Sequence, residues 1–496
     1  MNLLVFVAFA AVGLGTCLAL IPLLRRQTGP RAIWTFHHTH RVAVSRFGGV
    51  ALAAAFVTMS LAIFFGHSVA EDPLRTRLVI FFSALAMFGL GLWDDIRPLG
   101  ARRKLLVQVL IALAVCYSGV RIEKFQNPLT GEILELGAWG WVVTVLWLVA
   151  LTNLINIIDG IDGLAAGIGL MLMGLIAYVG LGGELLYPVL IAAGMVGALA
   201  GFLYYNFPPA KIYLGDGGAY LIGYLIAILT LVHSQKGTIV AALIAPLFAL
   251  ALPIVDVSLA IVRRGLRGLP IFRPDRKHLH HKLLEVGFSR TRAVLILYGL
   301  SLVFLLMAFG VFWSQGRWVP ILFGFLCVVL LLSARTFNFS RDWFAVGRVL
   351  ENSAELRRET HYALALTRWL ELEADRGAGL EELWSDFTFI ARKLGFSRVQ
   401  WQFNGQSRCW EDSERPAAGE AFECVHELGA HDAMVLSFEG DGRRMSRRVF
   451  EHLAELAAEG WLKAVNRSMA VNGAAALPTS PGPAPTGAGT EKAARS

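Results

Sequence analysis

Residues 139–180 read WGWVVTVLWLVALTNLINIIDGIDGLAAGIGLMLMGLIAYVG, two long apolar runs separated by a short polar turn. Each run is long enough to cross the hydrocarbon core of a bilayer as a helix. The turn carries Asp159 and Asp162, each followed by glycine. A carboxylate beside hydrocarbon is costly to keep and usually serves a function. The stretch therefore predicts two membrane helices joined by a functional loop at one membrane face.

The same pattern extends over the first two thirds of the chain. The full chain has 496 residues, of which 55% are hydrophobic and only 17% are charged. This composition is typical of polytopic membrane proteins, and about eleven apolar runs are long enough to span a bilayer. We expect all-α spans at 2–24, 47–66, 77–93, 104–120, 139–157, 163–182, 185–205, 218–232, 238–262, 292–313 and 318–334. The first run lacks a charged leading region and a small-residue cleavage site, so we interpret it as a retained span.

Basic residues in the short loops predict the orientation. Loops 25–46, 94–104, 206–217 and 263–291 carry 18 Lys and Arg residues, whereas the opposite loops carry 6. Because the basic side normally faces the cytoplasm, those four loops and the C-terminus are expected there. The aspartates at the span ends fall on this same side: Asp94, Asp95, Asp159, Asp162, Asp216 and Asp256.

The net charge and the cysteine content limit the kinds of ligand, disulfide and metal site that we expect. The net charge is +8, but the positive residues lie in membrane loops, which favours anionic lipid headgroups and phosphates over nucleic acid. The five cysteines are Cys17, Cys116, Cys327, Cys409 and Cys424, and none forms a C-x-x-C pair. They indicate neither a disulfide framework nor a zinc site.

The composition changes near residue 336, where the apolar runs stop and charge rises. We expect a membrane domain over 1–335, a cytoplasmic α+β domain over 341–470 and a disordered tail over 471–496. Helices are expected at 341–374, 378–394 and 444–468, with strands near 399–403, 420–427 and 433–439. The order of these elements is loosely similar to GAF-type sensory modules.

The first polar motif is Asp94-Asp95, followed by Lys104. Adjacent carboxylates at a helix end can hold Mg²⁺ or accept a proton from a phosphate. The alternative is a solvated helix end, although acidic groups are disfavoured at the negative end of a helix dipole.

The second motif places Asn153, Asn156 and Asp159 at helical spacing before Gly160, Asp162 and Gly163. Glycines permit a tight turn with exposed N–H groups, which can bind a nucleotide; ordinary helix capping is the alternative.

The third motif, residues 206–218, contains Asn206, Lys211, Tyr213 and Asp216. Lys211 can contact a phosphate, and the glycine turn around Asp216 can admit a bulky ligand. An ordinary loop would not require a lone carboxylate after such a long apolar segment.

The fourth motif follows Asp256 and includes Arg264 and the histidines His278, His280 and His281. Three histidines in four residues can bind zinc. Their arginine and lysine neighbours favour phosphate or substrate binding instead.

Together the four motifs resemble those of the polyprenyl-phosphate N-acetylhexosamine-1-phosphate transferase family, over roughly residues 1–335. The shared patterns are the Asp-Asp pair, N-x-x-N-x-x-D-G-x-D-G-L, N-x-x-P-A-K-x-x-x-G-D-x-G and H-x-H-H, in the family's order. The H-x-H-H form resembles the branch that starts O-antigen, teichoic acid and related glycans. Departures from the family pattern are His38, Ser45 and Ala219, which bear on phosphate contacts and not on the reaction.

The resemblance implies transfer of an N-acetylhexosamine 1-phosphate, with N-acetylglucosamine as the best guess, from a UDP-sugar to undecaprenyl phosphate, releasing UMP. Mg²⁺, with Mn²⁺ as a substitute, would be held by Asp216 and Asp95, and Asp94 would be the base. Substrate contacts are expected from these residues: Lys104, Asn153, Asn156, Asp159, Gly160, Asp162, Asn206, Lys211, Tyr213, Arg264, His278, His280 and His281.

Two alternatives stay open from sequence. One is the peptidoglycan-branch phospho-N-acetylmuramoyl-pentapeptide transferase, whose histidine motif usually has three consecutive histidines. The other is a non-enzymatic transporter or flippase, although its ionisable groups should lie near the bilayer midplane, often in matched repeats. A homodimer is a further, open expectation.

Overall fold

The computed structural model describes residues 3–26, 44–65, 73–126, 132–181, 185–234, 287–314 and 346–472, except 404–405, 413–420 and 429–433, with scattered positions between 247 and 328. These residues form two compact units that divide between Gly347 and Arg348. Each unit has its own hydrophobic core.

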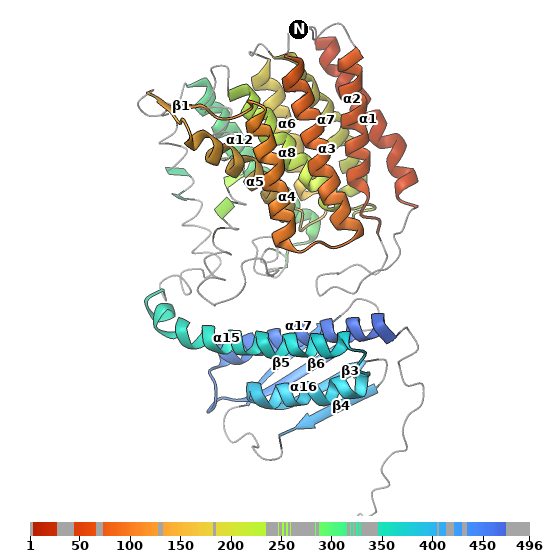
Figure 1. The fold of residues 1–496 in the computed structure, drawn as a ribbon, viewed down its shortest axis with the longest axis vertical. Helices are drawn as coiled ribbons and strands as arrows, with labels where there is room; N and C mark the ends of the chain where they lie inside the picture. Colours follow the sequence, from red (N-terminus) through yellow and green to blue (C-terminus); the bar gives the residue numbers. More distant parts are fainter. Residues whose placement is uncertain are drawn as a thin grey trace, which may run out of the picture. The chain divides into compact units, whose positions relative to one another are not determined.

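The first unit is mainly helical (Figure 1). Its helices are α1 Leu3–Leu24, α2 Gly48–Phe65, α3 Leu74–Ile96, α4 Ala101–Tyr117, α5 Trp139–Ile158, α6 Leu164–Gly180, α7 Leu186–Asn206, α8 Gly215–Ser234 and α12 Arg290–Trp313. A short antiparallel pair, β1 Lys124–Gln126 and β2 Ile133–Glu135, precedes α5. The sequence analysis did not predict this pair.

Seven of the described helices are long and apolar enough to cross a membrane: α1, α2, α3, α5, α7, α8 and α12. Helices α4 and α6 are shorter, at 17 residues each. A multi-pass membrane protein is therefore confirmed. The count of eleven stays a prediction, because the expected spans 238–262 and 318–334 lie largely outside the described residues.

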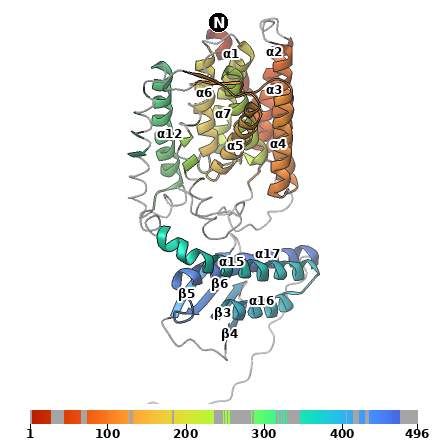
Figure 2. The same cartoon turned by 60° about the vertical axis from the view of Figure 1, so that its left-hand side comes forward.

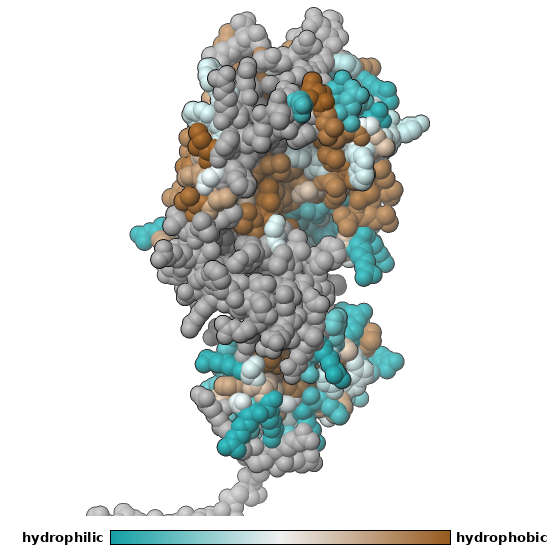
Figure 3. Space-filling model, turned by 90° about the vertical axis from the view of Figure 1, so that its left-hand side faces the viewer, coloured by the Kyte–Doolittle hydropathy of each residue, from teal (hydrophilic) through white to brown (hydrophobic). Residues whose placement is uncertain are grey.

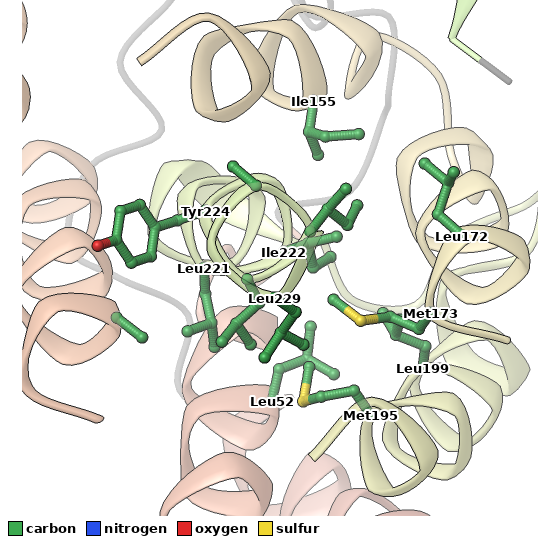
Figure 4. Packing of buried hydrophobic residues seen from close by; sticks show 14 of the residues in the cluster. Leu52, Ile155, Leu172, Met173, Met195, Leu199, Leu221, Ile222, Tyr224 and Leu229 are labelled. Carbon is green, nitrogen blue, oxygen red and sulfur yellow. The ribbon is translucent and has the colours of Figure 1, made fainter. Parts of the chain in front are cut away.

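Helix α8 forms the centre of the first unit. It is apolar on all sides and 89% of its membrane-length window is buried, as expected for a helix surrounded by others. Figure 4 shows Leu221, Ile222 and Leu229 of α8 among side chains from α2, α5, α6 and α7. Because α8 begins at Gly215, this packing also fixes the position of Asp216 in its first turn.

The outer helices keep apolar side chains on the surface, as lipid contact requires. Phe82, Leu106, Leu146 and Leu306 are all at least 59% exposed. In Figure 3, brown hydrophobic residues cover much of the visible described surface of the first unit, whereas the second unit carries many teal hydrophilic residues.

The second unit combines three helices with a four-stranded antiparallel sheet of order β4-β3-β6-β5. Its elements are α15 Val346–Asp375, α16 Leu380–Leu394, β3 Phe396–Phe403, β4 Gln406–Glu411, β5 Ala421–Leu428, β6 Met434–Asp441 and α17 Arg447–Asn472. Figure 2 presents these elements from a second direction. Strand β4 was not predicted, the likeness to GAF-type modules stays a prediction, and residues 473–496 lie outside the described residues.

The core of the second unit explains its layering. In β3, Val399 and Trp401 are buried. On the opposite face of the strand, Arg398 and Gln400 are partly buried and Gln402 is exposed. Trp401 packs edge-on against Trp461 of α17, with ring centroids 5.9 Å apart. This alternation is typical of a sheet with one face against helices and the other toward solvent.

Candidate active site

Lys104 joins two carboxylates from distant parts of the sequence. Its Nζ donates to Asp94 Oδ2 at 2.9 Å and to Asp216 Oδ2 at 3.1 Å. The three side chains are only 21%, 13% and 28% exposed, respectively, so water screens their charges incompletely. The last turn of α3, the first turn of α4 and the first turn of α8 thus meet at one ion cluster, which we call the Lys104 cluster (Asp94, Lys104 and Asp216).

The turn between α3 and α4 explains how Lys104 reaches this cluster. Pro98 follows the C-cap Arg97, and a residue before proline avoids the helical conformation, so α3 ends here. The Leu99 N–H then donates to Asp94 Oδ1 at 2.6 Å. Asp94 therefore closes the turn with one oxygen and holds Lys104 with the other.

Asp95 links α3 to the start of α8. Its Oδ1 accepts the Asp216 N–H at 2.9 Å, and its Oδ2 accepts the Gly217 N–H at 3.0 Å. The first N–H groups of a helix lack partners within the helix and attract negative charge. A carboxylate from a neighbouring helix thus caps α8 and orients Asp216.

Glycine allows this close approach. A Cβ added to Gly91 would lie 2.5 Å from the Asp216 carbonyl oxygen and 2.6 Å from the Gly217 nitrogen. Gly215 has φ +73°, and a Cβ there would lie 2.7 Å from Asp95 Oδ2. Both positions require glycine for α3 and α8 to touch.

A second set of hydrogen bonds joins the 159–163 loop to the 207–214 loop. Asp162 Oδ2 accepts the Ala210 N–H at 3.1 Å. Asn206 accepts the Gly163 N–H at 3.0 Å through Oδ1 and donates through Nδ2 to the Ile212 carbonyl at 2.8 Å. Asp162 and Asn206 therefore hold two predicted binding loops together.

Asp159, the C-cap of α5, adds a further carboxyl group to this end of the helices. Burial, followed by the charges of Asp216, Asp95 and Asp162, raises the pKa of the Asp159 carboxyl well above its usual value. Mutual repulsion of this kind is relieved by a bound cation.

The carboxylate oxygens of Asp94 and Asp216 are the kind of ligand that a hard divalent cation prefers. In this structure the Lys104 ammonium lies between them. No three His, Cys, Asp or Glu side chains form a complete metal-binding group within the part of the chain that the structure describes.

The other predicted residues divide into three groups. The Asn153 side chain makes hydrogen bonds within the protein: its Nδ2 donates to Gln108 Oε1 at 2.6 Å and to the Val149 carbonyl at 2.8 Å. Asn156 is partly buried, whereas Gly160 and Lys211 are exposed. Arg264, His278, His280, His281 and Asp256 lie outside the described residues.

The main chain of Tyr213 joins the 207–214 loop to the segment that leads into α2. Its N–H donates to the Ser45 carbonyl at 2.8 Å, and its carbonyl accepts the Gly48 N–H at 3.0 Å. Burial raises the pKa of the Tyr213 hydroxyl to about 12, so this group stays protonated at neutral pH. Main-chain hydrogen bonds therefore fix the loop that carries the Tyr213 ring.

Known proteins are similar to this chain over the residues that form the Lys104 cluster and the two loops. A family model described as "Glycosyl transferase family 4" matches residues 77–234, which contain the Lys104 cluster and both loops. The Bacillus subtilis (strain 168) protein named "Probable undecaprenyl-phosphate N-acetylglucosaminyl 1-phosphate transferase" is 33% identical over 330 residues, which are 66% of this chain and 90% of that protein. The chain belongs to the polyprenyl-phosphate N-acetylhexosamine-1-phosphate transferase family.

Two further relatives represent different branches. "Decaprenyl-phosphate N-acetylglucosaminephosphotransferase" of Mycobacterium tuberculosis is 33% identical over 307 residues, covering 56% of this chain and 74% of that protein. "Phospho-N-acetylmuramoyl-pentapeptide-transferase" of Moorella thermoacetica is 32% identical over 295 residues, covering 56% of this chain and 86% of that protein. The chain is thus a membrane-embedded transferase, and the transporter alternative is set aside.

Three residues of this transferase were not assigned to the site from sequence. Gln108 lies one helical turn after Lys104, and this spacing was the available signal. The Arg46 carbonyl packs against Gly215, and Tyr298 contacts Gly163. Their roles depend on contacts between distant segments, which sequence spacing does not reveal.

Proposed function

We propose that this transferase moves N-acetylglucosamine 1-phosphate from UDP-N-acetylglucosamine to undecaprenyl phosphate. In the net reaction, an oxygen of the lipid phosphate forms a bond to the sugar-bearing phosphorus, and the bond from that phosphorus to the UMP oxygen breaks. The products are undecaprenyl-diphospho-N-acetylglucosamine and UMP. The observation that carries the proposal is the Lys104 cluster, which gathers charged groups from three motifs at one helix end.

Transfer between two anions needs charge neutralisation and alignment more than covalent chemistry from the protein. We assign Asp216 as the first ligand of a divalent cation, with Asp94 on the opposite side of Lys104. Bound Mg²⁺, or Mn²⁺ in its place, would supply positive charge to the pyrophosphate and to the leaving UMP. Lys104 contributes a second, permanent positive charge.

The structure changes the role that we give to Asp95. Both of its oxygens already accept main-chain N–H groups of α8. We therefore propose that Asp95 orients Asp216, in place of the direct metal contact expected from sequence. Asp94 remains our candidate for accepting the proton of the lipid phosphate, because its carboxylate lies beside the Lys104 ammonium, the positive charge that would attract that phosphate.

The nucleotide side is assigned to the loop that follows α5. Asn156, Asp159 and Gly160 are the proposed uridine contacts, and the Tyr213 ring is the proposed stacking surface. Lys211 is exposed and suited to a phosphate. Arg264 and the histidines His278, His280 and His281 are proposed phosphate or sugar contacts on sequence grounds alone.

Placement in the cell is also part of the proposal. The basic loops support a cytoplasmic active site and C-terminal unit in a bacterial inner membrane. The lipid tail would lie against the apolar outer helices. Independence from nucleic acid and formation of a homodimer stay predictions.

A donor panel tests this proposal. Purified protein, undecaprenyl phosphate and Mg²⁺ are incubated separately with UDP-N-acetylglucosamine, UDP-N-acetylgalactosamine and UDP-N-acetylmuramoyl-pentapeptide, and UMP and lipid product are measured. We expect the highest kcat/KM with UDP-N-acetylglucosamine. Preference for the muramoyl-pentapeptide donor would assign the chain to the peptidoglycan branch, and no turnover with any donor would reject the proposed reaction.

A further inference from the structure

A tyrosine from α12 contacts the start of α6. The Tyr298 hydroxyl donates to the Gly163 carbonyl at 2.5 Å. Its ring lies directly over Gly167, where an added Cβ would collide with the ring carbons and the hydroxyl. Helices α6 and α12 run beside each other in Figures 1 and 2, so the tyrosine bridges neighbouring helices.

Gly163 is held on two sides. Its carbonyl accepts from Tyr298, while its N–H donates to Asn206 at the end of α7. Its φ of +81° is the left-handed conformation that glycine adopts most readily. The last residue of the 159–163 loop is therefore fixed by α7 and α12 together.

We propose that Tyr298 is a positioning residue for the nucleotide-sugar side of the site. This inference rests on the proposed function, in which the 159–163 loop contacts the donor. Tyr298 bonds to the loop's last carbonyl and does not enter the Lys104 cluster, so it acts by ordering the loop before the donor binds. Binding is weaker when part of the interaction free energy must order a mobile loop.

The lipid acceptor should depend on Tyr298 much less. The proposed acceptor residue, Asp94, is positioned by hydrogen bonds from Leu99 and Lys104, and Tyr298 takes part in neither bond. Loss of the tyrosine hydroxyl should thus raise KM for the donor and leave kcat and the acceptor KM nearly unchanged. A raised KM with unchanged kcat indicates that the lost interaction stabilised the bound substrate and the transition state equally.

The test compares Tyr298→Phe with Tyr178→Phe, a matched control on the same pair of helices. Tyr178 of α6 packs edge-on against Phe309 of α12, with ring centroids 5.3 Å apart, far along α6 from Gly163. Both variants lose one hydroxyl and keep the ring. We expect Tyr298→Phe to raise donor KM roughly three- to tenfold, the effect of one lost hydrogen bond.

A second variant and a stability measurement separate positioning from a general structural role. Gly167→Ala should displace the Tyr298 ring and raise donor KM in the same direction. Thermal unfolding in detergent should show that both tyrosine variants are folded at the assay temperature, so that a change in donor KM is not caused by loss of folded protein. A donor KM for Tyr298→Phe within twofold of the Tyr178→Phe value, with wild type active, would overturn this inference alone. Inactive wild type with every donor would instead overturn the proposed function, and this inference with it.

Discussion

At the scale of single residues, the site depends on ion pairs between partly buried side chains of opposite charge. Lys104 is shared between Asp94 and Asp216, so its ammonium is compensated on both sides. Removing one partner of such a pair leaves a charge without compensation, which is more damaging than the loss of a surface ion pair. Loss of either carboxylate should therefore also disturb the position of Lys104.

Replacement of Asp94 by asparagine should separate turnover from nucleotide binding. Asp94→Asn keeps the side-chain shape but removes the proposed proton acceptor, so kcat should fall about 100-fold or more, within the range of general base catalysis. UDP affinity should change by less than about threefold, about 0.7 kcal/mol. Steady-state kinetics and UDP binding by calorimetry measure the two effects.

The matched control for this prediction is Glu123→Gln, another carboxylate-to-amide change. Glu123 pairs with Arg121 at the surface after α4 and is 59% exposed. Its substitution should leave kcat and UDP affinity near wild type. If UDP affinity in Asp94→Asn falls as far as kcat, Asp94 belongs to the nucleotide or metal subsite.

Sequence predicted which residues gather at the site better than what each one does. Carboxylates at the ends of membrane spans on one face must lie at one depth, so a shared depth of Asp94, Asp159 and Asp216 followed from the span count. Their lateral approach depends on how the helices pack. The internal bonds of Asp95 and Asn206 did not follow. Their partners are main-chain N–H groups and carbonyls in other segments, which carry no sequence signature.

At the scale of elements, the site depends on how closely α3 approaches α8. Gly91 and Gly215 remove the side chains that would keep these helices apart. Small residues serve this purpose in membrane proteins, where association relies on packing and interhelical hydrogen bonds. The Asp95 cap on α8 is possible only at this short separation.

A methyl group at this contact should therefore be disruptive. Gly91→Ala should lower stability by about 1–3 kcal/mol, as overpacking commonly does, and should reduce kcat by displacing Asp216. Gly89→Ala lies on the same helix, where an added Cβ meets nothing within 4 Å, and serves as control. Detergent thermal unfolding and kcat should both change in the first variant only; equal behaviour of the two would contradict the proposed helix contact.

Helix positions were largely predictable because membrane spans are long and strongly apolar. The expected spans 139–157 and 185–205 coincide closely with α5 and α7. Short strands were harder to predict. Strand β4, with the sequence QSRCWE, is mostly polar and has only six positions, and its formation depends on pairing with β3.

At the scale of the whole molecule, the two units have separate cores, and the described charged site belongs to the first. We propose that the second unit is cytoplasmic and serves regulation or partner binding. Its fully buried Trp401 and Trp461 give it the means to fold on its own. The membrane unit should then retain the chemistry by itself.

Truncation after Arg335 tests this division. The shortened protein should keep its transfer rate within roughly tenfold of wild type, about 1.4 kcal/mol in the barrier. The comparison uses equal amounts of monodisperse protein in one detergent. Complete loss of activity in a folded, monodisperse truncated protein would indicate that the second unit contributes to the site.

The most direct test of the central claim is Mg²⁺-dependent formation of undecaprenyl-diphospho-N-acetylglucosamine by wild type and Asp216→Asn, followed with a radiolabelled donor. An amide is a poor substitute for a carboxylate as a ligand of a hard cation. The account predicts labelled lipid and stoichiometric UMP from wild type, loss of both after chelation of Mg²⁺, and no product from a folded Asp216→Asn protein at any Mg²⁺ concentration. Near-normal turnover in Asp216→Asn would contradict the account.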